Sequence, residues 1–202
     1  MQNFNLPELK FEEERHLYWL NGEEIPSVST VMKPISSSVY GEVDAEVLNR
    51  AAARGTAVHQ AIETYLNFGF EDIPFSCRTY LDAFIQFYED YRPEVVSTEF
   101  QMYHKYLRYA GTCDLLATIE DKLWLIDYKT SYKVEKMLTR VQLEAYRKAL
   151  ATHGIKVEGK AILHLQKSGK YKFVPHEMND PVSWEVFTAS KKVYDYIKNG
   201  GK

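Results

Sequence analysis

The alternation of hydrophobic and polar residues along the chain predicts a mixture of strands and helices. Short runs rich in β-branched and aromatic residues, with apolar positions at every second residue, predict strands. These runs span residues 10–20, 23–28, 95–103, 108–119, 123–129, 159–166 and 171–176. Asn21–Gly22 separates the first two runs and is the strongest short hairpin signal in the chain. We therefore expect an N-terminal β-hairpin over residues 10–28, followed by strands of a larger sheet.

Longer segments with apolar residues three and four positions apart predict helices. They span residues 44–68, 77–91, 135–150 and 181–198. Asp44 and Asp180 are suitable N-cap residues, and Pro181 fits the first helical position. Residues 32–40 contain Pro34 and three serines, which favours a loop. Because helices precede and interrupt the strands, the expected fold class is α/β, a mixed sheet flanked by helices.

Length and composition restrict the class of protein further. A chain of 202 residues can fill one core but is short for two α/β domains, so one domain over 1–202 is expected, with its core at about 44–178. A hydrophobic content of 45% excludes global disorder. Two cysteines imply no disulfide framework. The sequence has no signal-like start and no apolar run of membrane-spanning length, so a soluble cytoplasmic protein without membrane contact is expected.

The predicted hairpin on either side of Glu120–Asp121 carries the candidate chemistry. If its loop is centred on that bond, Asp114 lies directly opposite Asp127. Opposed side chains have Cβ atoms roughly 4.5–5.5 Å apart, and like charges there are destabilising. A divalent cation held by the carboxylates removes this repulsion, and oxygen ligands suit Mg²⁺ or Mn²⁺. Lys129, two residues beyond Asp127, projects from the same face, so the pattern predicts a metal site with a lysine beside it.

Four short motifs carry a resemblance to a known family. Asp127-Tyr-Lys129-Thr, after the apolar run 123–126, resembles the second half of the PD-(D/E)XK nuclease motif. Gly111-Thr-Cys-Asp114 resembles the first half, with cysteine in place of proline. Arg54-Gly-Thr-Ala-Val-His59 is similar to the histidine-bearing helix of the RecB-like branch, and Gln142-Leu-Glu-Ala-Tyr146 to its Q-x-x-x-Y helix. That branch includes phage exonucleases, Cas4-like proteins and a mitochondrial genome maintenance exonuclease.

The resemblance implies a restriction-endonuclease-like fold and metal-dependent hydrolysis of phosphodiester bonds. The implied catalytic residues are Asp114, Asp127 and Lys129. The implied ligands of Mg²⁺ or Mn²⁺ are Asp114, Asp127, His59 and the backbone carbonyl of Tyr128. Lys129 would orient the attacking water or stabilise the pentavalent phosphorane, with general-base action also open. Gln142 and Tyr146 would position the substrate strand or its scissile phosphate. With two cysteines, the chain cannot hold the four-cysteine iron–sulfur cluster of some relatives.

His59 has two interpretations, because a single histidine on a helix is more often a packing or capping residue. Its apolar neighbours at helical spacing lie on another side of the helix, so His59 need not enter the core. Together with the resemblance, this favours the ligand role. Glu63, one turn later, could accept a hydrogen bond from His59 and orient it. Glu99 matches a carboxylate found in relatives, although a salt bridge at the strand edge explains it equally well.

A basic stripe on the third predicted helix is the candidate DNA contact. The net charge of −3 argues against a protein coated with basic surface. A DNA-binding surface would therefore require a local cluster of basic residues. Lys136, Arg140 and Arg147 fall within a narrow arc at 100° per residue, beside the arc of Gln142 and Tyr146. This stripe is expected to follow a phosphate backbone, and a solvated face of an amphipathic helix is the alternative.

The leading hypothesis is a metal-dependent deoxyribonuclease, an exonuclease acting on single-stranded DNA or DNA ends in recombination, repair or replication. DNA is the expected partner, together with a recombinase, helicase or replication protein. The alternative is a catalytically inactive nuclease fold that serves as a DNA-binding or docking module. The presence of Asp114, Asp127 and Lys129 together argues against it, and against a plain salt-bridged hairpin. A hydrolase of other phosphate esters would be expected to carry a Gly-rich phosphate loop, which the sequence lacks.

Overall fold

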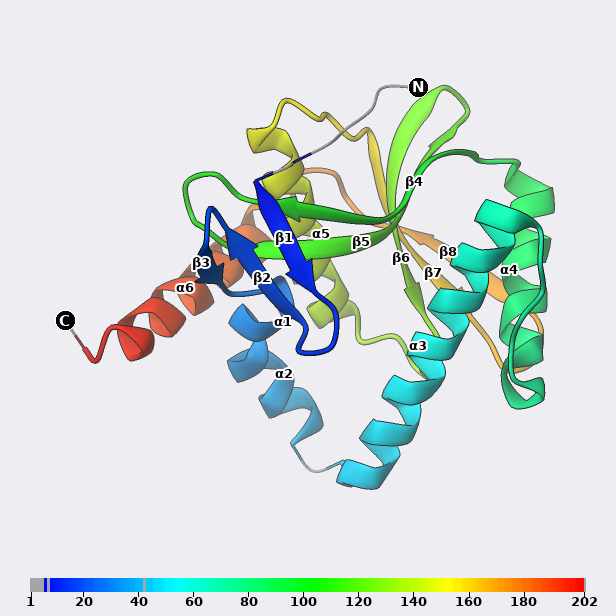
Figure 1. The fold of residues 1–202 in the computed structure, drawn as a ribbon, viewed down its shortest axis with the longest axis horizontal. Helices are drawn as coiled ribbons and strands as arrows, with labels where there is room; N and C mark the ends of the chain where they lie inside the picture. Colours follow the sequence, from blue (N-terminus) through cyan, green and yellow to red (C-terminus); the bar gives the residue numbers. More distant parts are fainter. Residues whose placement is uncertain (1–5, 7, 42, 202) are drawn as a thin grey trace.

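A five-stranded mixed sheet forms the centre of the structure, a computed structural model that describes residues 6, 8–41 and 43–201 (Figure 1). The strand order is β4-β5-β6-β7-β8. The strands are β4 (Glu94–Tyr103), β5 (Ala110–Ile119), β6 (Lys122–Lys129), β7 (Gly159–Leu165) and β8 (Tyr171–Pro175). β6 and β7 are parallel, and the other neighbouring pairs are antiparallel. The helix between β6 and β7 provides the crossover that a parallel pair requires.

Helices cover both faces of this sheet (Figure 1). α5 (Lys136–Thr152) and α6 (Pro181–Lys198) pack on one face, where Leu116, Leu125 and Ile162 point into the core. α3 (Ala45–Phe68) and α4 (Arg78–Tyr91) pack on the other face, against Leu115 and Leu163. The predicted α/β class, with helices flanking a mixed sheet, is confirmed.

The β5–β6 hairpin has the predicted register. Ile119 pairs with Lys122, so Glu120 and Asp121 form a two-residue turn, and their φ angles of 50° and 60° are those that such a turn requires. The pairing continues to Leu115 opposite Ile126. One position further along the same register, Asp114 lies opposite Asp127. The turn therefore sets which carboxylates meet at the end of the hairpin.

The N-terminal residues form a three-stranded sheet. Its strands are β1 (Leu9–Glu12), β2 (Leu17–Leu20) and β3 (Glu23–Ile25). The predicted hairpin turn is confirmed, because Asn21 and Gly22 have φ angles of 52° and 82° between paired strands. The prediction of one strand over residues 10–20 was wrong. The consecutive charged residues 13–15 cannot alternate between two faces, and the chain reverses there with His16 at a φ of 52°.

Two further boundaries differ from the sequence prediction. The strand predicted to reach residue 28 ends at Ile25, because Ser27 caps α1 (Val28–Val31) and its hydroxyl accepts the Thr30 N–H at 3.0 Å. The loop predicted over residues 32–40 is wrong, since α2 (Lys33–Tyr40) is helical. Proline is tolerated in its first turn, and the hydroxyls of Ser36 and Ser38 donate to carbonyls three residues earlier.

The remaining helices agree with their predicted signals. The carboxylate of Asp44 accepts the N–H groups of Glu46 and Val47, and α3 then runs to its C-cap, Gly69, whose φ is 71°. α4 follows a short 3-10 turn, η1 (Phe75–Cys77). Asp180 caps α6 by accepting the Ser183 N–H at 3.0 Å. Among the described residues, no helix has the length and hydrophobicity needed to cross a membrane.

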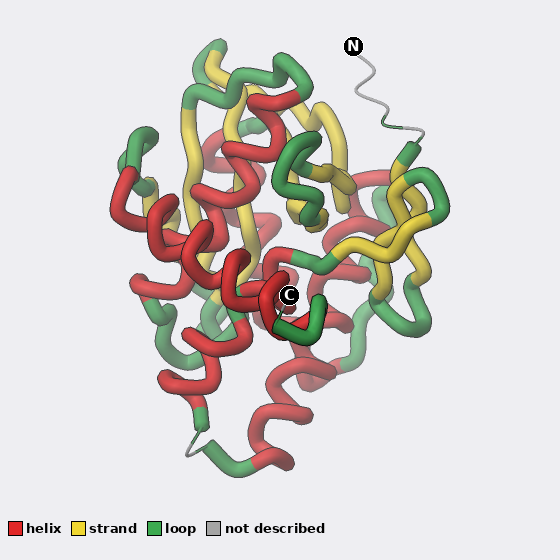
Figure 2. Tube along the Cα trace, turned by 90° about the vertical axis from the view of Figure 1, so that its left-hand side faces the viewer, coloured by secondary structure: helices red, strands yellow, loops and turns green. Residues whose placement is uncertain are grey.

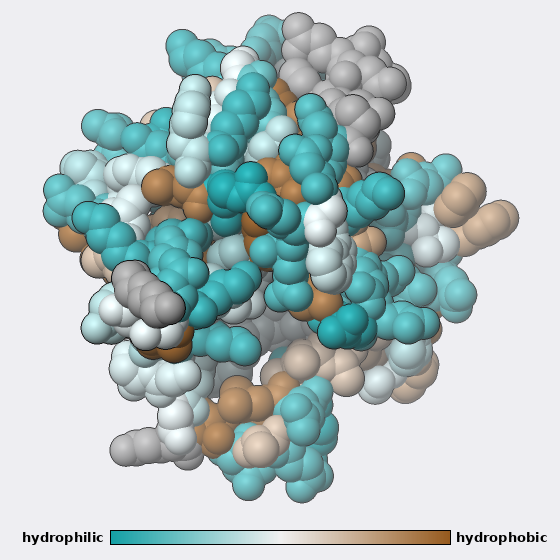
Figure 3. Space-filling view, turned by 60° about the vertical axis from the view of Figure 1, so that its left-hand side comes forward, coloured by the Kyte–Doolittle hydropathy of each residue, from teal (hydrophilic) through white to brown (hydrophobic). Residues whose placement is uncertain are grey.

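α2 and the first turns of α3 form the lower end of the molecule (Figures 1 and 2). Tyr40, Val43, Val47 and Leu48 are partly exposed in this region. Figure 3 shows apolar side chains gathered on this lowest part. The segment between the two helices includes residue 42, which lies outside the described residues. α2 ends at Tyr40, which lines the same cavity as Lys129 at the end of β6.

Candidate metal centre and active site

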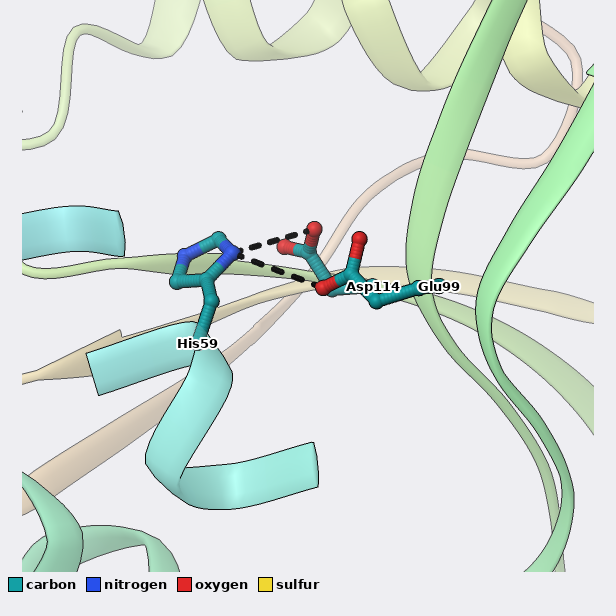
Figure 4. Close-up of side chains that lie close together, drawn as sticks. All are labelled: His59, Glu99 and Asp114. Atoms are coloured by element: carbon teal, nitrogen blue, oxygen red, sulfur yellow. Dashed lines mark ion pairs between the residues drawn. The ribbon is translucent and has the colours of Figure 1, made fainter. Parts of the chain in front are cut away.

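Three potential metal ligands converge from three different elements (Figure 4). His59 comes from α3, Glu99 from β4 and Asp114 from β5, and one ligand atom of each lies within 4.8 Å of the others. Nδ1 of His59 is 3.4 Å from Oδ1 of Asp114 and 3.8 Å from Oε1 of Glu99. Two carboxylates and one imidazole are a donor set that suits Mg²⁺ or Mn²⁺.

The backbone of β4 is distorted at Glu99. Its φ of 44° is left-handed, a conformation that costs of order 1–3 kcal/mol in a non-glycine residue and that occurs preferentially at functional sites. Thr98 pairs with Leu115 and Phe100 with Cys113, so Glu99 lies between two regular pairs. Its partner across the strands by this register is Asp114. The distortion thus occurs where the two carboxylates face each other.

β5 is also irregular at this point. Leu115 and Ala117 pack on the α3–α4 face of the sheet, whereas Cys113 and Leu116 pack on the α5 face. In a regular strand Cys113 and Leu115 would share a face, so the alternation breaks around Asp114. This break lets the Asp114 side chain reach His59 on the α3 side, although Asp127 opposite it contacts α5.

The charges of the three groups are strongly coupled. Burial raises the pKa of Glu99 to about 7, and the nearby charge of Asp114 acts in the same direction. Burial acts to lower the pKa of His59, but Asp114 overcomes this effect and raises it to about 9. The same contact holds the pKa of Asp114 below its usual value, despite burial. Positive charge is therefore favoured between these carboxylates, and a divalent cation would supply it with release of protons.

Asp127 and Lys129 form a second group beside the first. The ammonium of Lys129 donates to Oδ2 of Asp127, and Nε2 of Gln142 donates to Oδ1 of Asp127 at 3.0 Å and contacts the Tyr146 hydroxyl at 3.1 Å. Burial raises the pKa of Asp127 to about 6, although Lys129 acts to lower it. Asp127 is thus a buried carboxylate whose two oxygens both accept hydrogen bonds. These contacts bring together four predicted site residues, namely Asp127, Lys129, Gln142 and Tyr146.

Tyr128 links the two groups. Its backbone N–H donates to Oδ2 of Asp114 at 2.5 Å. Its ring meets the His59 ring edge-on, with centroids 5.4 Å apart. The ring contact, which the sequence analysis missed, fixes the orientation of the imidazole. Metal coordination by the Tyr128 carbonyl stays a prediction.

The structure places the two additional glutamates differently with respect to His59. Among the described residues, His59 has ionic contacts with Asp114 and Glu99, and Glu63 is not one of its partners. Nδ1 of His59 points towards the strands (Figure 4), so the carboxylates it meets come from the sheet and not from its own helix. Glu99, which the sequence left open between a carboxylate found in relatives and a salt bridge at the strand edge, lies in ionic contact with His59. The strand position of Glu99 was visible in the sequence, but its backbone distortion was not.

The basic stripe on α5 has structural partners. Nε of Arg140 donates to Oδ2 of Asp180 at 2.8 Å, which joins α5 to the first turn of α6. Arg147 makes two hydrogen bonds to Glu144, a buried carboxylate on the same helix. Lys136 is exposed near the start of α5. Ion pairing accounts for both arginines, and contact of the stripe with phosphates stays a prediction.

Comparison with known proteins identifies the family. The family model of the PD-(D/E)XK nuclease superfamily matches residues 74–194, more than half of the chain. The matched segment includes Glu99, Asp114, Asp127 and Lys129 and begins after His59. The chain therefore belongs to the PD-(D/E)XK nuclease superfamily, as its motifs indicated, and has the restriction-endonuclease-like fold expected of it.

Solved structures that align with the chain have low sequence identity to it. The crystal structure of SSO0001 aligns at 14% identity and a TM-score of 0.49, over 86% of this chain and 75% of that one. An alkaline exonuclease (LHK-Exo) from Laribacter hongkongensis aligns at 14% identity and a TM-score of 0.43, over 86% of this chain and 91% of its own. The same exonuclease in complex with dAMP aligns at 14% identity and a TM-score of 0.42, over 87% of this chain and 92% of its own. No curated protein matches the sequence significantly.

Proposed function

We propose that this protein is a metal-dependent deoxyribonuclease. It would act as an exonuclease on single-stranded DNA or on DNA ends, in recombination, repair or replication. Membership of a nuclease superfamily supports hydrolysis of phosphodiester bonds. The observation that carries the proposal is the convergence of His59, Glu99 and Asp114 within 4.8 Å, next to the hydrogen-bonded Asp127 and Lys129.

In the proposed site, His59, Glu99 and Asp114 hold the metal ion, and Asp127 is the further carboxylate of the predicted ligand set, whose charge acts on both His59 and Glu99. A bound Mg²⁺ or Mn²⁺ would lower the pKa of a water molecule and neutralise charge on the phosphoryl oxygens. Tyr128 supports the ligands on both sides, through its N–H to Asp114 and its ring to His59. Such supporting contacts orient ligands and raise metal affinity.

The remaining residues act on water and substrate. The ammonium of Lys129, held by Asp127, would donate a hydrogen bond to the attacking water or to a phosphoryl oxygen as negative charge develops there. Gln142 and the hydroxyl of Tyr146 continue this line of polar groups along α5 and would position the scissile phosphate. The hydrogen bonds among these groups fix their orientation before substrate binds.

A cavity beside these groups would accept part of the substrate strand, such as a base. Its volume is about 200 Å³, and both Lys129 and Gln142 line it. Met32, Tyr40 and Leu138 supply apolar and aromatic surface on its other side. Stacking and apolar contacts of this kind accept any base, which agrees with a nuclease that cuts without sequence preference.

The test is hydrolysis of end-labelled single- and double-stranded DNA, each linear and circular, with Mg²⁺, Mn²⁺ or EDTA. We expect mononucleotides or short products from linear DNA with either metal, intact circles and no reaction in EDTA. Cleavage of circular single strands would refute exonuclease action. Absence of cleavage from every substrate would refute the nuclease assignment. A matched RNA strand tests the choice of DNA, and Lys129→Ala is the control against a contaminating nuclease.

A further inference from the structure

A second cavity, of about 380 Å³, lies next to the carboxyl ends of the parallel strands β6 and β7. In mixed and parallel sheets this edge is the common place for ligands. Thr130 and Ser131 follow β6, His164 belongs to β7, and Lys167 and Ser168 belong to the turn before β8. Arg54 reaches the cavity from α3. We call this cavity, defined by these residues, the basic pocket.

The charge of the basic pocket is unbalanced. Arg54 and Lys167 line it, and none of its described lining residues is an aspartate or glutamate. Neither of the two cations forms an ion pair with a carboxylate among the described residues, whereas Arg50, one turn earlier on α3, pairs with Glu46. Hydroxyl groups of Thr130 and Ser168 add hydrogen-bond donors. An anion with several oxygen acceptors complements this lining.

Arg54 supplies an independent observation. Its Nε is buried and, within the described part of the chain, has no hydrogen-bond partner. A buried donor left unpaired costs about 1–3 kcal/mol, and native proteins usually pair such groups. The guanidinium is held over the ring of Tyr80, 5.7 Å from its centroid, which restricts its direction. The protein thus fixes the position of the arginine but provides no hydrogen-bond acceptor for its Nε, which is the arrangement expected of a site that binds an anion.

Contacts between its lining elements support the basic pocket. α3 passes close to the end of β6 at Gly55, where an added Cβ would lie 3.9 Å from Oγ1 of Thr130. Nε2 of His164 donates to the carbonyl of Ser131 at 2.7 Å, which fixes the segment after β6. In the β7–β8 turn, the N–H of Gly169 donates to the Gln166 carbonyl at 3.0 Å. These contacts hold the turn that carries Lys167 across from Arg54.

The basic pocket adjoins the candidate active site. Thr130 directly follows Lys129, and Ser131 lines both this pocket and the cavity beside Lys129 and Gln142. A DNA strand with its scissile phosphate at Lys129 could therefore place a neighbouring phosphate in the basic pocket by crossing residues 129–131. The end of β6 separates the two sites, so the protein would contact the DNA strand on both sides of this β-strand end.

We propose that the basic pocket binds a phosphate group of the substrate strand. Arg54 and Lys167 supply the charge, and the hydroxyls of Thr130 and Ser168 supply hydrogen bonds. An internal phosphodiester and a terminal phosphate share this chemistry, and the experiment separates them. The identity of the substrate rests on the proposed function, but phosphate binding requires no hydrolysis and can be measured without metal.

The test measures binding of fluorescent single-stranded oligonucleotides in EDTA at several salt concentrations. The variants are Arg54→Gln and Lys167→Gln, with Arg50→Gln and Lys170→Gln as matched controls from the same helix and the same turn. We expect each pocket variant to weaken binding severalfold and to reduce the slope of log K against log salt by about 0.7 per lost contact. The controls should change neither quantity. Equal loss in pocket and control variants, or no loss in either pocket variant, would overturn the proposal.

Oligonucleotides with a 5′-phosphate, a 3′-phosphate or hydroxyl ends identify the group that is bound. Equal weakening for all ends assigns an internal phosphodiester, and weakening confined to one phosphorylated end assigns a terminal phosphate. Lys167 is exposed, so its substitution should leave the melting temperature unchanged even if Arg54→Gln lowers it. Hydrolysis of bis(p-nitrophenyl) phosphate by the wild type with Mn²⁺ reports on the proposed function separately. If that reaction fails, the binding comparison still decides the role of the pocket.

Discussion

A buried ion cluster between α5 and β7 allows a quantitative prediction about stability. The Glu144 side chain is 0% exposed and that of Lys160 is 1% exposed. The carboxylate of Glu144 accepts hydrogen bonds from Lys160 and, at 2.5 and 3.0 Å, from Arg147. Glu144→Gln leaves the Lys160 ammonium buried without a carboxylate partner. Breaking a buried pair from one side costs about 3–5 kcal/mol, so this variant should lose that much free energy of unfolding.

Substitutions of the three cluster residues should reduce the free energy of unfolding by different amounts. Lys160→Met leaves Glu144 paired with Arg147, so the loss should be about 1.5–3 kcal/mol, the usual contribution of a hydrogen bond to a charged group. Arg147→Met leaves the buried Glu144–Lys160 pair intact and removes a side chain that is 20% exposed. Its loss should be at most about 1 kcal/mol.

Urea unfolding of the three variants and the wild type would measure these differences, with equal m-values as the condition for comparing free energies. A loss for Glu144→Gln no larger than that for Arg147→Met would refute the reasoning from buried charge. The same Arg147→Met protein also tests the basic stripe. If Arg147 contacts phosphate, the salt dependence of single-strand binding must become weaker, and an unchanged slope would leave Arg147 with its structural role alone.

Three further predictions follow from the site and its supports. His59→Ala should leave the fold intact and weaken Mn²⁺ affinity by roughly ten- to a hundredfold in calorimetry, and a variant that melts early but binds Mn²⁺ normally would remove His59 from the site. Burial acts to raise the pKa of Asp180, but Arg140 and the cap hydrogen bonds lower it to about 2. This carboxylate therefore stabilises the fold above its unfolded pKa of about 4, and the stabilisation is lost as pH falls towards 2. Asp180→Asn should lower the free energy of unfolding by about 1 kcal/mol at pH 7 and by less at pH 3, and an equal difference at both pH values would contradict this. Gly159→Ala should destabilise the protein by about 1–3 kcal/mol, because its Cβ would lie 2.2 Å from Cδ2 of Trp124, and an unchanged denaturation midpoint would show that the indole moves freely.

The β5–β6 hairpin and its carboxylates could be predicted from sequence because the information is local. Glu120–Asp121 fixes a two-residue turn, and the turn fixes the register that sets Asp114 against Asp127. Asp127 and Lys129 share a face by the alternation of a strand alone. The start of α3 was likewise readable from its cap, Asp44.

The position of Glu99 could not be predicted, because it depends on a distortion that arises only when β4 and β5 pair. Its left-handed φ and the break in alternation at Asp114 have no signature in either strand alone. α2 was missed because serine and proline favour loops on average, whereas here the hydroxyls bond back to the helix. The ion pair of Arg140 with Asp180 joins residues far apart in the sequence. Helical spacing predicts that the basic residues of α5 share one face, but it does not predict that Arg140 pairs with Asp180.

The most direct test of the metal-dependent nuclease compares Asp114→Ala with Lys129→Ala in two assays. Calorimetry measures Mn²⁺ binding, and a labelled single-stranded oligonucleotide measures cleavage with Mn²⁺ or EDTA. We predict that the wild type binds Mn²⁺ and cuts only when the metal is present. Asp114→Ala should lose both binding and cleavage, whereas Lys129→Ala should lose cleavage and keep most of the binding. Cleavage in EDTA, or wild-type cleavage by Asp114→Ala, would contradict the account.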